Sequence, residues 1–120
     1  MTQLPPATDD VAVLVDLLGP ETALRLLEAA AGTRVYVARP GAGDALSTII
    51  GLDGATAIHA RYGHGWFKVP MGRSWRVLCY VAMGLSRPKA ALRAGCSENM
   101  VHDVLTRYGR PASRQLDLFG

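Results

Sequence analysis

The sequence lacks a long apolar run and has only two cysteines. It holds no stretch of about 18 consecutive apolar residues, and no basic segment followed by an apolar block stands near its N-terminus. We therefore expect a soluble, cytoplasmic protein that has no membrane partner. Cys79 and Cys96 lie in apolar helical patterns without CxxC or His-containing ligand spacing. This predicts buried thiols in a reducing compartment, with neither a disulfide nor a metal site.

The sequence is also poor in groups that carry out catalysis. Its three histidines, His59, His64 and His102, fall in different predicted elements. None of them has a nucleophile, a carboxylate or a ligand partner at a convincing spacing. The glycines form neither GxGxxG nor a P-loop, so nucleotide binding has no support. We expect no enzymatic activity, no catalytic residues and no cofactor.

Acidic side chains are scarce in the second half of the chain. Residues 1–60 carry three basic and seven acidic side chains, whereas residues 61–120 carry ten basic and three acidic ones. The net charges of the halves are −4 and +7, within an overall charge of +3. Cations gathered in this way are typical of proteins that neutralise phosphates. A solvated face that happens to be basic explains the charge equally well.

The first half has a helix, glycine and strand pattern that occurs twice. Thr8 and the two aspartates after it predict a helix start, Gly19-Pro20 ends that helix, and a second helix runs to Gly32. A β-branched segment, residues 33–38, predicts a strand. Seven positions then return 32 residues later: Leu17, Leu18, Gly19, Ala23, Leu26, Val35 and Val37 recur as Ile49, Ile50, Gly51, Ala55, Ile58, Phe67 and Val69. Two such units are too few for a solenoid.

The pattern predicts a mainly α protein with short β-strands. The short strands, residues 33–38 and 65–69, are marginal alone, so we expect them to pair with each other or across a dimer interface. A small domain often completes its core by dimerising, which makes a homodimer the expectation. We predict an N-terminal helix-strand dimerisation module in residues 1–72, preceded by a loose arm at residues 1–7. A helix-turn-helix domain follows in residues 73–109, and a flexible tail in residues 110–120.

Residues 73–109 have the spacing of a helix-turn-helix. Ser86 and Ser97 can each cap a helix. Gly95 suits the tight turn between the two helices, and Ala91 is small enough for them to cross closely. A stripe of apolar residues should bury the second helix: Val101, Val104 and Leu105. The pattern therefore predicts a recognition helix that begins near Ser97 and binds double-stranded DNA.

Outward positions of that second helix can contact base edges, and Asn99 is the best candidate. The base-contact candidates are Ser97, Glu98, Asn99, His102, Asp103 and Thr106. The phosphate-contact candidates are Arg87, Lys89, Arg93 and Arg107, with Arg73 and Arg76 as secondary ones. An ordinary helical hairpin is the alternative. Glu98 and Asp103 favour that alternative because carboxylates repel phosphate.

The order of these motifs along the chain resembles that of one known family. The order Ile49-Ile50-Gly51, Ala55, Tyr62-Gly63 and Val69-Pro70, followed by a helix-turn-helix, resembles the middle operon regulator (Mor/C) family of Mu-like phages over residues 45–108. The resemblance implies a homodimeric transcription activator that recruits RNA polymerase. It also implies that the segment around the second strand approaches DNA, although the family's paired glycine is here Gly63-His64-Gly65. The secondary candidates from this segment are Gly63, Gly65, Trp66 and Lys68. Trp66 and Phe67 would more often be core residues.

The last residues resemble a different motif. Gln115, Leu116, Asp117, Leu118 and Phe119 are similar to the bacterial sliding-clamp-binding pentapeptide and follow a polar, proline-containing linker. In that motif the Gln amide forms hydrogen bonds, and the Leu and Phe side chains fill apolar pockets. Alternatively, these side chains fold back over the protein's own core. Two functions therefore stand beside each other: a sequence-specific transcription regulator, and a replication-associated adaptor or inhibitor that binds the sliding clamp.

Overall fold

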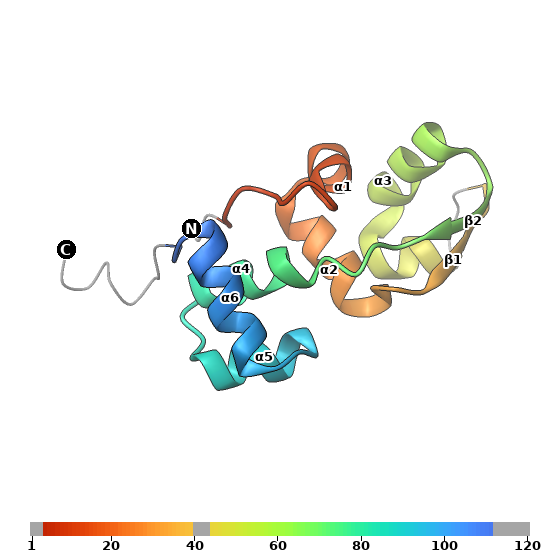
Figure 1. The fold of residues 1–120 in the computed structure, drawn as a ribbon. Coiled ribbons are helices and arrows are strands. Elements are labelled where there is room, and N and C mark those ends of the chain that lie inside the picture. The colour runs from red at the N-terminus through yellow and green to blue at the C-terminus, as the bar shows by residue number, and fades with distance from the viewer. Residues whose placement is uncertain (1–3, 40–43, 112–120) are drawn as a thin grey trace. The chain divides into compact units, whose positions relative to one another are not determined.

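The computed structural model describes residues 4–39 and 44–111, which form six helices and two strands (Figure 1). They make up two compact units, residues 9–72 and residues 4–8 together with 73–111. The prediction of a mainly α protein with short β-strands is confirmed, and the two strands form one small sheet within the described residues. Within the described ranges, none of the helices has both the length and the apolar character needed to cross a bilayer.

The first unit contains three helices and both strands. In chain order these are α1 (Ala12–Leu18), α2 (Pro20–Ala30), β1 (Arg34–Val37), α3 (Ala45–Tyr62) and β2 (Gly65–Lys68). The expected helix start at Thr8 is wrong by about one turn. Thr8 is buried, residues 9–11 form a turn, and Val11 precedes α1 without a side-chain capping bond.

Two glycines interrupt the helices of this unit at corresponding places. Gly19 separates α1 from α2 with φ 84° and ψ 155°, and Gly51 lies inside α3 with φ 83° and ψ 166°. This region of backbone space is almost closed to residues with a Cβ. α3 is therefore two helices joined at a kink, and Asp44 caps the first of them by accepting a bond of 3.2 Å from the Ser47 amide.

The two strands pair with each other, antiparallel, within the one chain (Figure 1). Val35 lies opposite Phe67, and Tyr36 lies opposite Trp66. Side chains alternate between the two faces of a strand, so Val35 and Val37 are buried while Tyr36 points to solvent. α3 packs on β1, α1 and α2, which covers the inner side of the ribbon.

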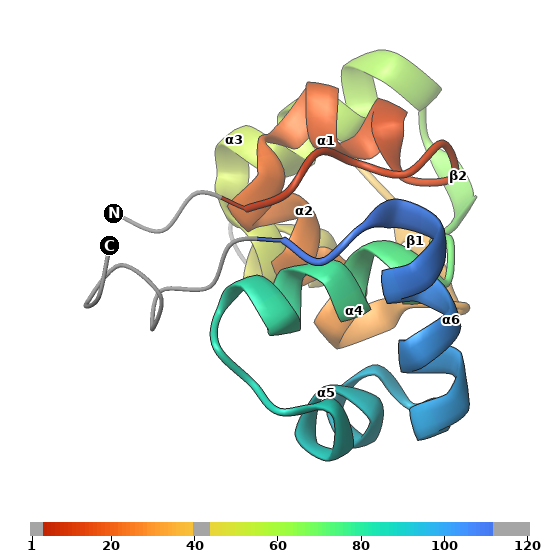
Figure 2. The same ribbon diagram turned by 60° about the vertical axis from the view of Figure 1, so that its left-hand side comes forward.

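The second unit is a group of three helices, α4 (Arg73–Ala82), α5 (Arg87–Ala94) and α6 (Glu98–Tyr108), each in contact with the other two (Figure 2). Trp75 on α4 is fully buried, and its indole Nε1 donates a hydrogen bond of 3.0 Å to the Pro5 carbonyl. Residues 4–8 thus pack with this unit and do not form the loose arm expected from the sequence. A buried indole needs an acceptor, and the N-terminal segment supplies it.

The two helix kinks yield a matched prediction. We expect Gly19→Ala and Gly51→Ala each to lower the free energy of unfolding by about 1–3 kcal/mol, because a Cβ strains this backbone conformation. A Cβ at either position would meet no atom within 4 Å, so strain alone sets the cost. Chemical denaturation measures the effect. Thr56→Ala, at an exposed position of α3, serves as the control and should change stability by less than about 0.5 kcal/mol. Unchanged stability in both glycine variants would contradict the kinks.

Candidate nucleic-acid interface

The turn between α4 and α5 is closed by backbone hydrogen bonds and a serine cap. The Leu85 amide donates to the Tyr80 carbonyl at 3.0 Å, and the Gly84 amide donates to the Val81 carbonyl at 3.0 Å. This pair of bonds satisfies carbonyls that the end of α4 would leave without partners. Ser86 then starts α5, since its Oγ accepts from the Lys89 amide at 3.4 Å.

The turn between α5 and α6 has the same pattern of backbone hydrogen bonds in a shorter link, residues 95–97. Gly95 adopts the left-handed conformation, with φ 72° and ψ 40°. The Cys96 amide donates to the Ala91 carbonyl at 2.9 Å, and the Gly95 amide donates to the Leu92 carbonyl at 3.3 Å. These two bonds are those of a Schellman motif. Ser97 Oγ accepts from the Met100 amide at 3.1 Å, so a new helix begins immediately after the turn.

Small side chains allow the helices of this unit to approach closely. Ala90, Ala91 and Ala94 on α5 are buried, and α6 buries Val101 and Val104. Residues 86–107 are therefore two short helices that meet at Gly95 and share a core, as the sequence spacing predicted.

The outer side of α6 carries the polar side chains that the sequence singled out. Seven of the sequence candidates are all exposed: Ser97, Glu98, Asn99, His102, Asp103, Thr106 and Arg107. Ser97 Oγ is occupied by its cap, and the Thr106 hydroxyl donates to the His102 carbonyl at 2.9 Å. Asn99 and His102 consequently offer the more versatile hydrogen-bonding groups on this side.

Two of the arginine candidates hold the unit together. Arg76 Nη2 donates to the Arg93 carbonyl at 3.0 Å, and Arg76 Nε donates to the Tyr80 hydroxyl at 3.4 Å. The Arg93 guanidinium lies 4.9 Å from the centre of the fully buried Tyr80 ring. A cation at the C-terminal end of α5 also opposes the helix dipole. Arg76 and Arg93 therefore position α5 against α4, whatever further contacts they make.

Cys96 lies in the turn beside two guanidinium groups. Burial raises the pKa of the Cys96 thiol, and the nearby charges of Arg73 and Arg76 offset part of that rise. The thiol is thus neutral at pH 7. Cys79 is buried as predicted, but Cys96 is partly exposed, because the tight turn keeps it at the edge of the helical core.

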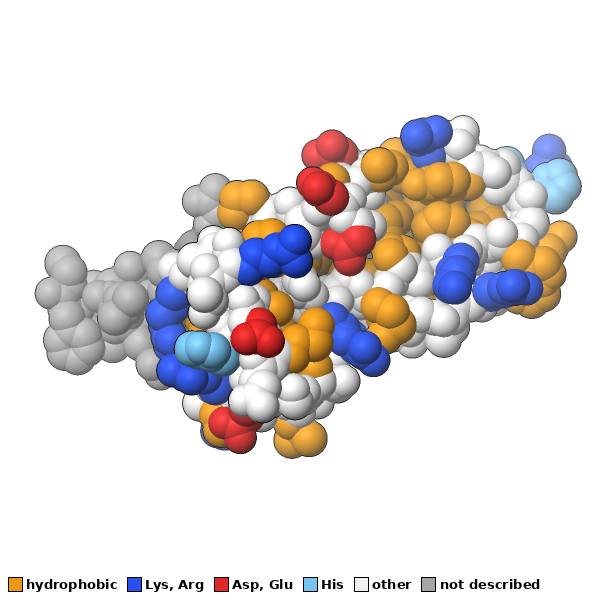
Figure 3. All heavy atoms as spheres, in the orientation of Figure 1, with side chains coloured by type: hydrophobic (Ala, Val, Ile, Leu, Met, Phe, Trp, Pro, Cys, Tyr) orange, Lys and Arg blue, Asp and Glu red, His pale blue; other side chains and the backbone are white. Residues whose placement is uncertain are grey.

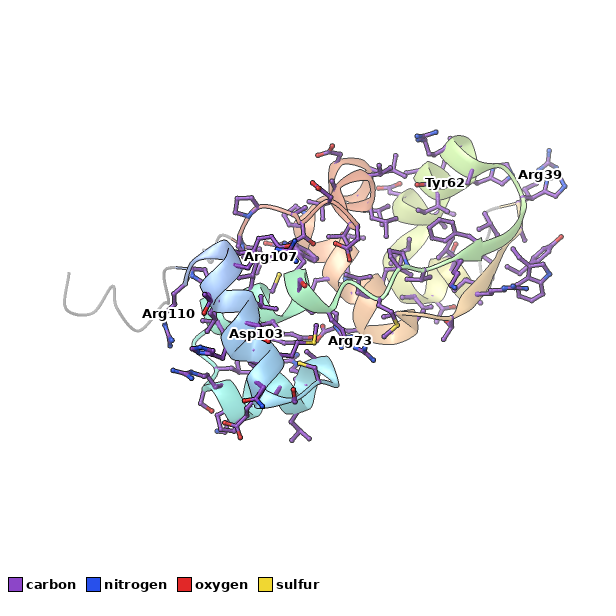
Figure 4. All side chains as sticks on the ribbon, viewed as in Figure 1. Arg39, Tyr62, Arg73, Asp103, Arg107 and Arg110 are labelled. Atoms are coloured by element: carbon purple, nitrogen blue, oxygen red, sulfur yellow. The ribbon has the colours of Figure 1, made fainter. Side chains whose placement is uncertain are left out.

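Charges of both signs lie on the three-helix unit. Figure 4 shows Asp103 part-way along α6, Arg107 nearer the C-terminal end of that helix, and Arg110 beyond it. Glu98 adds a carboxylate to the first turn of α6. Figure 3 shows acidic and basic side chains interspersed over this unit, so its surface is not uniformly cationic. Arg87 and Lys89 are exposed in the first turn of α5.

The solvent face of the strand pair is aromatic and basic. Arg34 lies opposite Lys68 and Tyr36 lies opposite Trp66, and all four side chains are exposed. The two rings form an edge-to-face pair with centroids 5.3 Å apart, yet Trp66 remains 69 % exposed. The expectation that Trp66 is a core residue is wrong, because strand alternation places it on the outer face.

Phe67 points to the other side of the ribbon and is half-buried. Its ring lies 4.8 Å from the Tyr62 ring. Gly63 and His64 connect α3 to β2, which begins at Gly65, and both glycines have positive φ, 74° and 128°. A Cβ at either of these glycines would meet no atom within 4 Å, so their role is conformational within this chain.

Comparison of the chain with protein-family models, curated proteins and solved structures gives no match. The resemblance to the Mor/C family stays a prediction from residue pattern. The clamp-binding candidates Gln115, Leu116, Asp117, Leu118 and Phe119 lie outside the described residues. In the described ranges, no three His, Cys, Asp or Glu side chains gather as metal ligands.

The turn at Gly95 can be tested apart from any ligand. We expect Gly95→Ala to lower the free energy of unfolding by about 1–2 kcal/mol, the cost of placing a Cβ in the left-handed region. A Cβ there would meet no atom within 4 Å, so crowding adds nothing. Gly95→Asn is the matched control and should cost less, since asparagine tolerates this conformation. Thermal unfolding of the three proteins gives the order. Equal stability of Gly95→Ala and the native protein would show that the turn is not left-handed.

Proposed function

We propose that this protein is a sequence-specific DNA-binding transcription regulator that acts through a helix-turn-helix formed by α5 and α6. The observation that carries the proposal is the left-handed turn at Gly95, which joins two short helices over a core of small residues. The polar side of the second helix, including Asn99 and His102, remains exposed. A helix of this kind fits the major groove of duplex DNA.

The N-terminal part of α6 supplies the base contacts in this proposal. Asn99 can form a bidentate pair with the N6 and N7 atoms of adenine, and His102 stands about one turn further along the helix. Glu98 can accept from the N4 amino group of cytosine. Its carboxylate lowers the general attraction to phosphate, so Glu98 and Asp103 favour discrimination between sequences over affinity.

Cations on α5 supply phosphate contacts that set the position of the protein on the duplex. Arg87 and Lys89 are exposed in the first turn of α5. Arg107 adds a cation in the last turn of α6. Contacts of this type release counterions, so binding should weaken steeply with salt.

The aromatic and basic face of the strand pair is a second candidate surface for DNA. Arg34 and Lys68 lie directly opposite each other, and like charges in that position repel. A phosphate between them relieves the repulsion. Trp66 and Tyr36 add flat apolar surface beside these cations. The resemblance to the Mor/C family favours transcriptional activation, with RNA polymerase as the further partner.

One experiment separates the two kinds of contact. Duplexes selected from a random pool by the purified protein define its preferred sequence, and equilibrium binding is then measured over a range of salt. Asn99→Ala should cost about 1–3 kcal/mol on the preferred duplex and relax the preference at one base pair. Lys89→Ala should weaken binding to all duplexes alike and reduce the slope of log affinity against log salt by about 1.

Arg25→Ala, on the exposed side of α2, is the charge-matched control and should leave affinity and salt slope unchanged. Circular dichroism of each variant shows whether the helices remain. If the pool yields no preferred sequence, the proposed regulator is wrong. If Lys89→Ala and Arg25→Ala behave identically, α5 does not face the duplex.

A second candidate function is binding to the bacterial sliding clamp. The sequence feature that favours it is the pentapeptide QLDLF at residues 115–119, placed after a polar linker that begins beyond the end of α6 at Tyr108. A short peptide that lies beyond a folded unit can dock its Leu and Phe side chains into apolar pockets of a partner. The helix-turn-helix would then bring DNA or another protein to the clamp.

Deletion of residues 115–120 tests this candidate directly. We expect the deletion to abolish binding to the purified clamp in a calorimetric titration, because the anchoring Leu and Phe side chains are lost. The Asn99→Ala variant, with its tail intact, is the control and should bind the clamp as the native protein does. Unchanged clamp affinity after the deletion would eliminate the candidate and leave the DNA proposal standing.

A further inference from the structure

The two repeats found in the sequence have the same three-dimensional form. Each is a short helix, a glycine kink, a longer helix and a strand: residues 12–37 in the first copy and residues 45–68 in the second. The kinks at Gly19 and Gly51 agree within 1° in φ, at 84° and 83°, and have similar ψ angles of 155° and 166°. Two structures this similar, at a fixed spacing of 32 residues, indicate an internal duplication.

The strand register has the symmetry of a two-fold dimer interface. Val35 lies opposite Phe67, its own counterpart 32 residues later. On either side of this pair, Arg34 faces Lys68 and Tyr36 faces Trp66. The counterpart of Arg34 in the second copy is Trp66, and the counterpart of Tyr36 is Lys68. Exchanging the two copies therefore turns one of these pairs into the other. An interface between two identical subunits shows this reciprocity, in which residue i contacts j and j contacts i. Here both partners belong to one chain.

The apolar faces of the two copies are covered by each other. The matched pair Leu14 and Leu46 is 3 % and 1 % exposed, and the matched pair Leu26 and Ile58 is fully buried. Helices of both copies contact one another, since α3 packs on α1 and on α2. A second subunit was expected because the apolar face of a small domain needs a cover. Within residues 9–72 the other copy already supplies that cover.

We infer that residues 9–72 are a single-chain equivalent of a two-fold dimer, in which the second copy occupies the place of a partner subunit and the protein is monomeric. The homodimer expected from the sequence is replaced by this arrangement. Residues 4–39 and 44–111, which the structure describes, contain two copies of the helix-strand unit and one α5–α6 pair. As a consequence that rests on the proposed function, one particle presents one recognition helix and binds a single site without two-fold symmetry.

The apolar side chains left on this unit do not form a symmetric surface. Val13 and Leu52 are about half exposed, at 48 % and 55 %. Their counterparts in the other copy are Ala45 and Pro20, so the internal axis does not relate the two exposed side chains to each other. Tyr36, Tyr62, Trp66 and Met71 are exposed as well, and their counterparts are Lys68, a buried Ala30, Arg34 and Arg39, so the internal axis does not repeat these side chains either. They supply no second strand pairing of the kind that Val35 and Phe67 make.

A cross-linking experiment tests the pairing within one chain. Tyr36 and Trp66 are exposed and lie opposite each other, so Tyr36→Cys with Trp66→Cys should form a disulfide across the ribbon with little effect on folding. Cys96→Ser in the same protein removes the other accessible thiol. On a non-reducing gel the oxidised protein should migrate as one chain, faster than its reduced form. Each single cysteine variant is the control and should show no shift.

The mass in solution is the second measurement. Light scattering on the full-length native chain should give the mass of one chain across a roughly hundredfold range of concentration. An oxidised product of two linked chains, no disulfide at all, or a dimer mass at any concentration in that range would overturn the inference. None of these outcomes depends on DNA, so they are distinct from failure of the proposed function.

A DNA-binding measurement adds a third test, the number of half-sites that the protein requires. A two-fold homodimer protects two half-sites whose centres lie about 34–36 Å apart, whereas one recognition helix protects one such segment. Duplexes with one copy of the selected half-site should therefore bind as tightly as duplexes with two, at one protein per half-site. A strict requirement for an inverted pair at fixed spacing would overturn the inference while supporting DNA binding itself.

Discussion

Helix breaks at glycine residues with positive φ govern both units of this chain. At Gly19 and Gly51 the backbone adopts a conformation that a Cβ would strain, and the chain changes direction there without a loop. At Gly95 the left-handed conformation lets backbone amides close one helix while Ser97 opens the next. The breaks at Gly19 and Gly51 use one residue each, and the break at Gly95 uses three, so the short helices stay close enough to bury one another. The cores of both units depend on these short connections between helices, since longer loops cost more entropy to close.

The same breaks explain why much of the fold could be predicted from the sequence. Gly-Pro at residues 19–20, the serine caps at Ser86 and Ser97 and the glycine at position 95 are local signals whose effect does not depend on distant residues. The alternation of residues 34–37 likewise sets which side chains face inward. Local chemistry decided these elements, so reasoning along the chain was sufficient for them.

Features that depend on contacts between distant residues could not be predicted in this way. The bond from Trp75 to the Pro5 carbonyl joins residues 70 positions apart and draws the N-terminal segment onto the three-helix unit. Arg76 holds the C-terminal carbonyl of α5, 17 residues away, although its charge alone suggested a phosphate contact. Helix spacing placed the exposed face of α6 correctly. The Ser97 cap was predicted, but the bond from the Thr106 hydroxyl to the His102 carbonyl is seen only in the structure.

The two copies in residues 9–72 have similar backbones but different surfaces. The difference arises because the chain continues from the second copy and passes over the first. Leu27 of the first copy is buried, whereas its counterpart His59 is partly exposed. The segment after β2 passes over the first copy, since a Cβ at Gly72 would lie 2.9 Å from Leu27 Cδ1. Only the second copy leads into the three-helix unit. The internal symmetry therefore ends at Gly72, and the described residues contain two copies of the helix-strand unit but one candidate recognition helix.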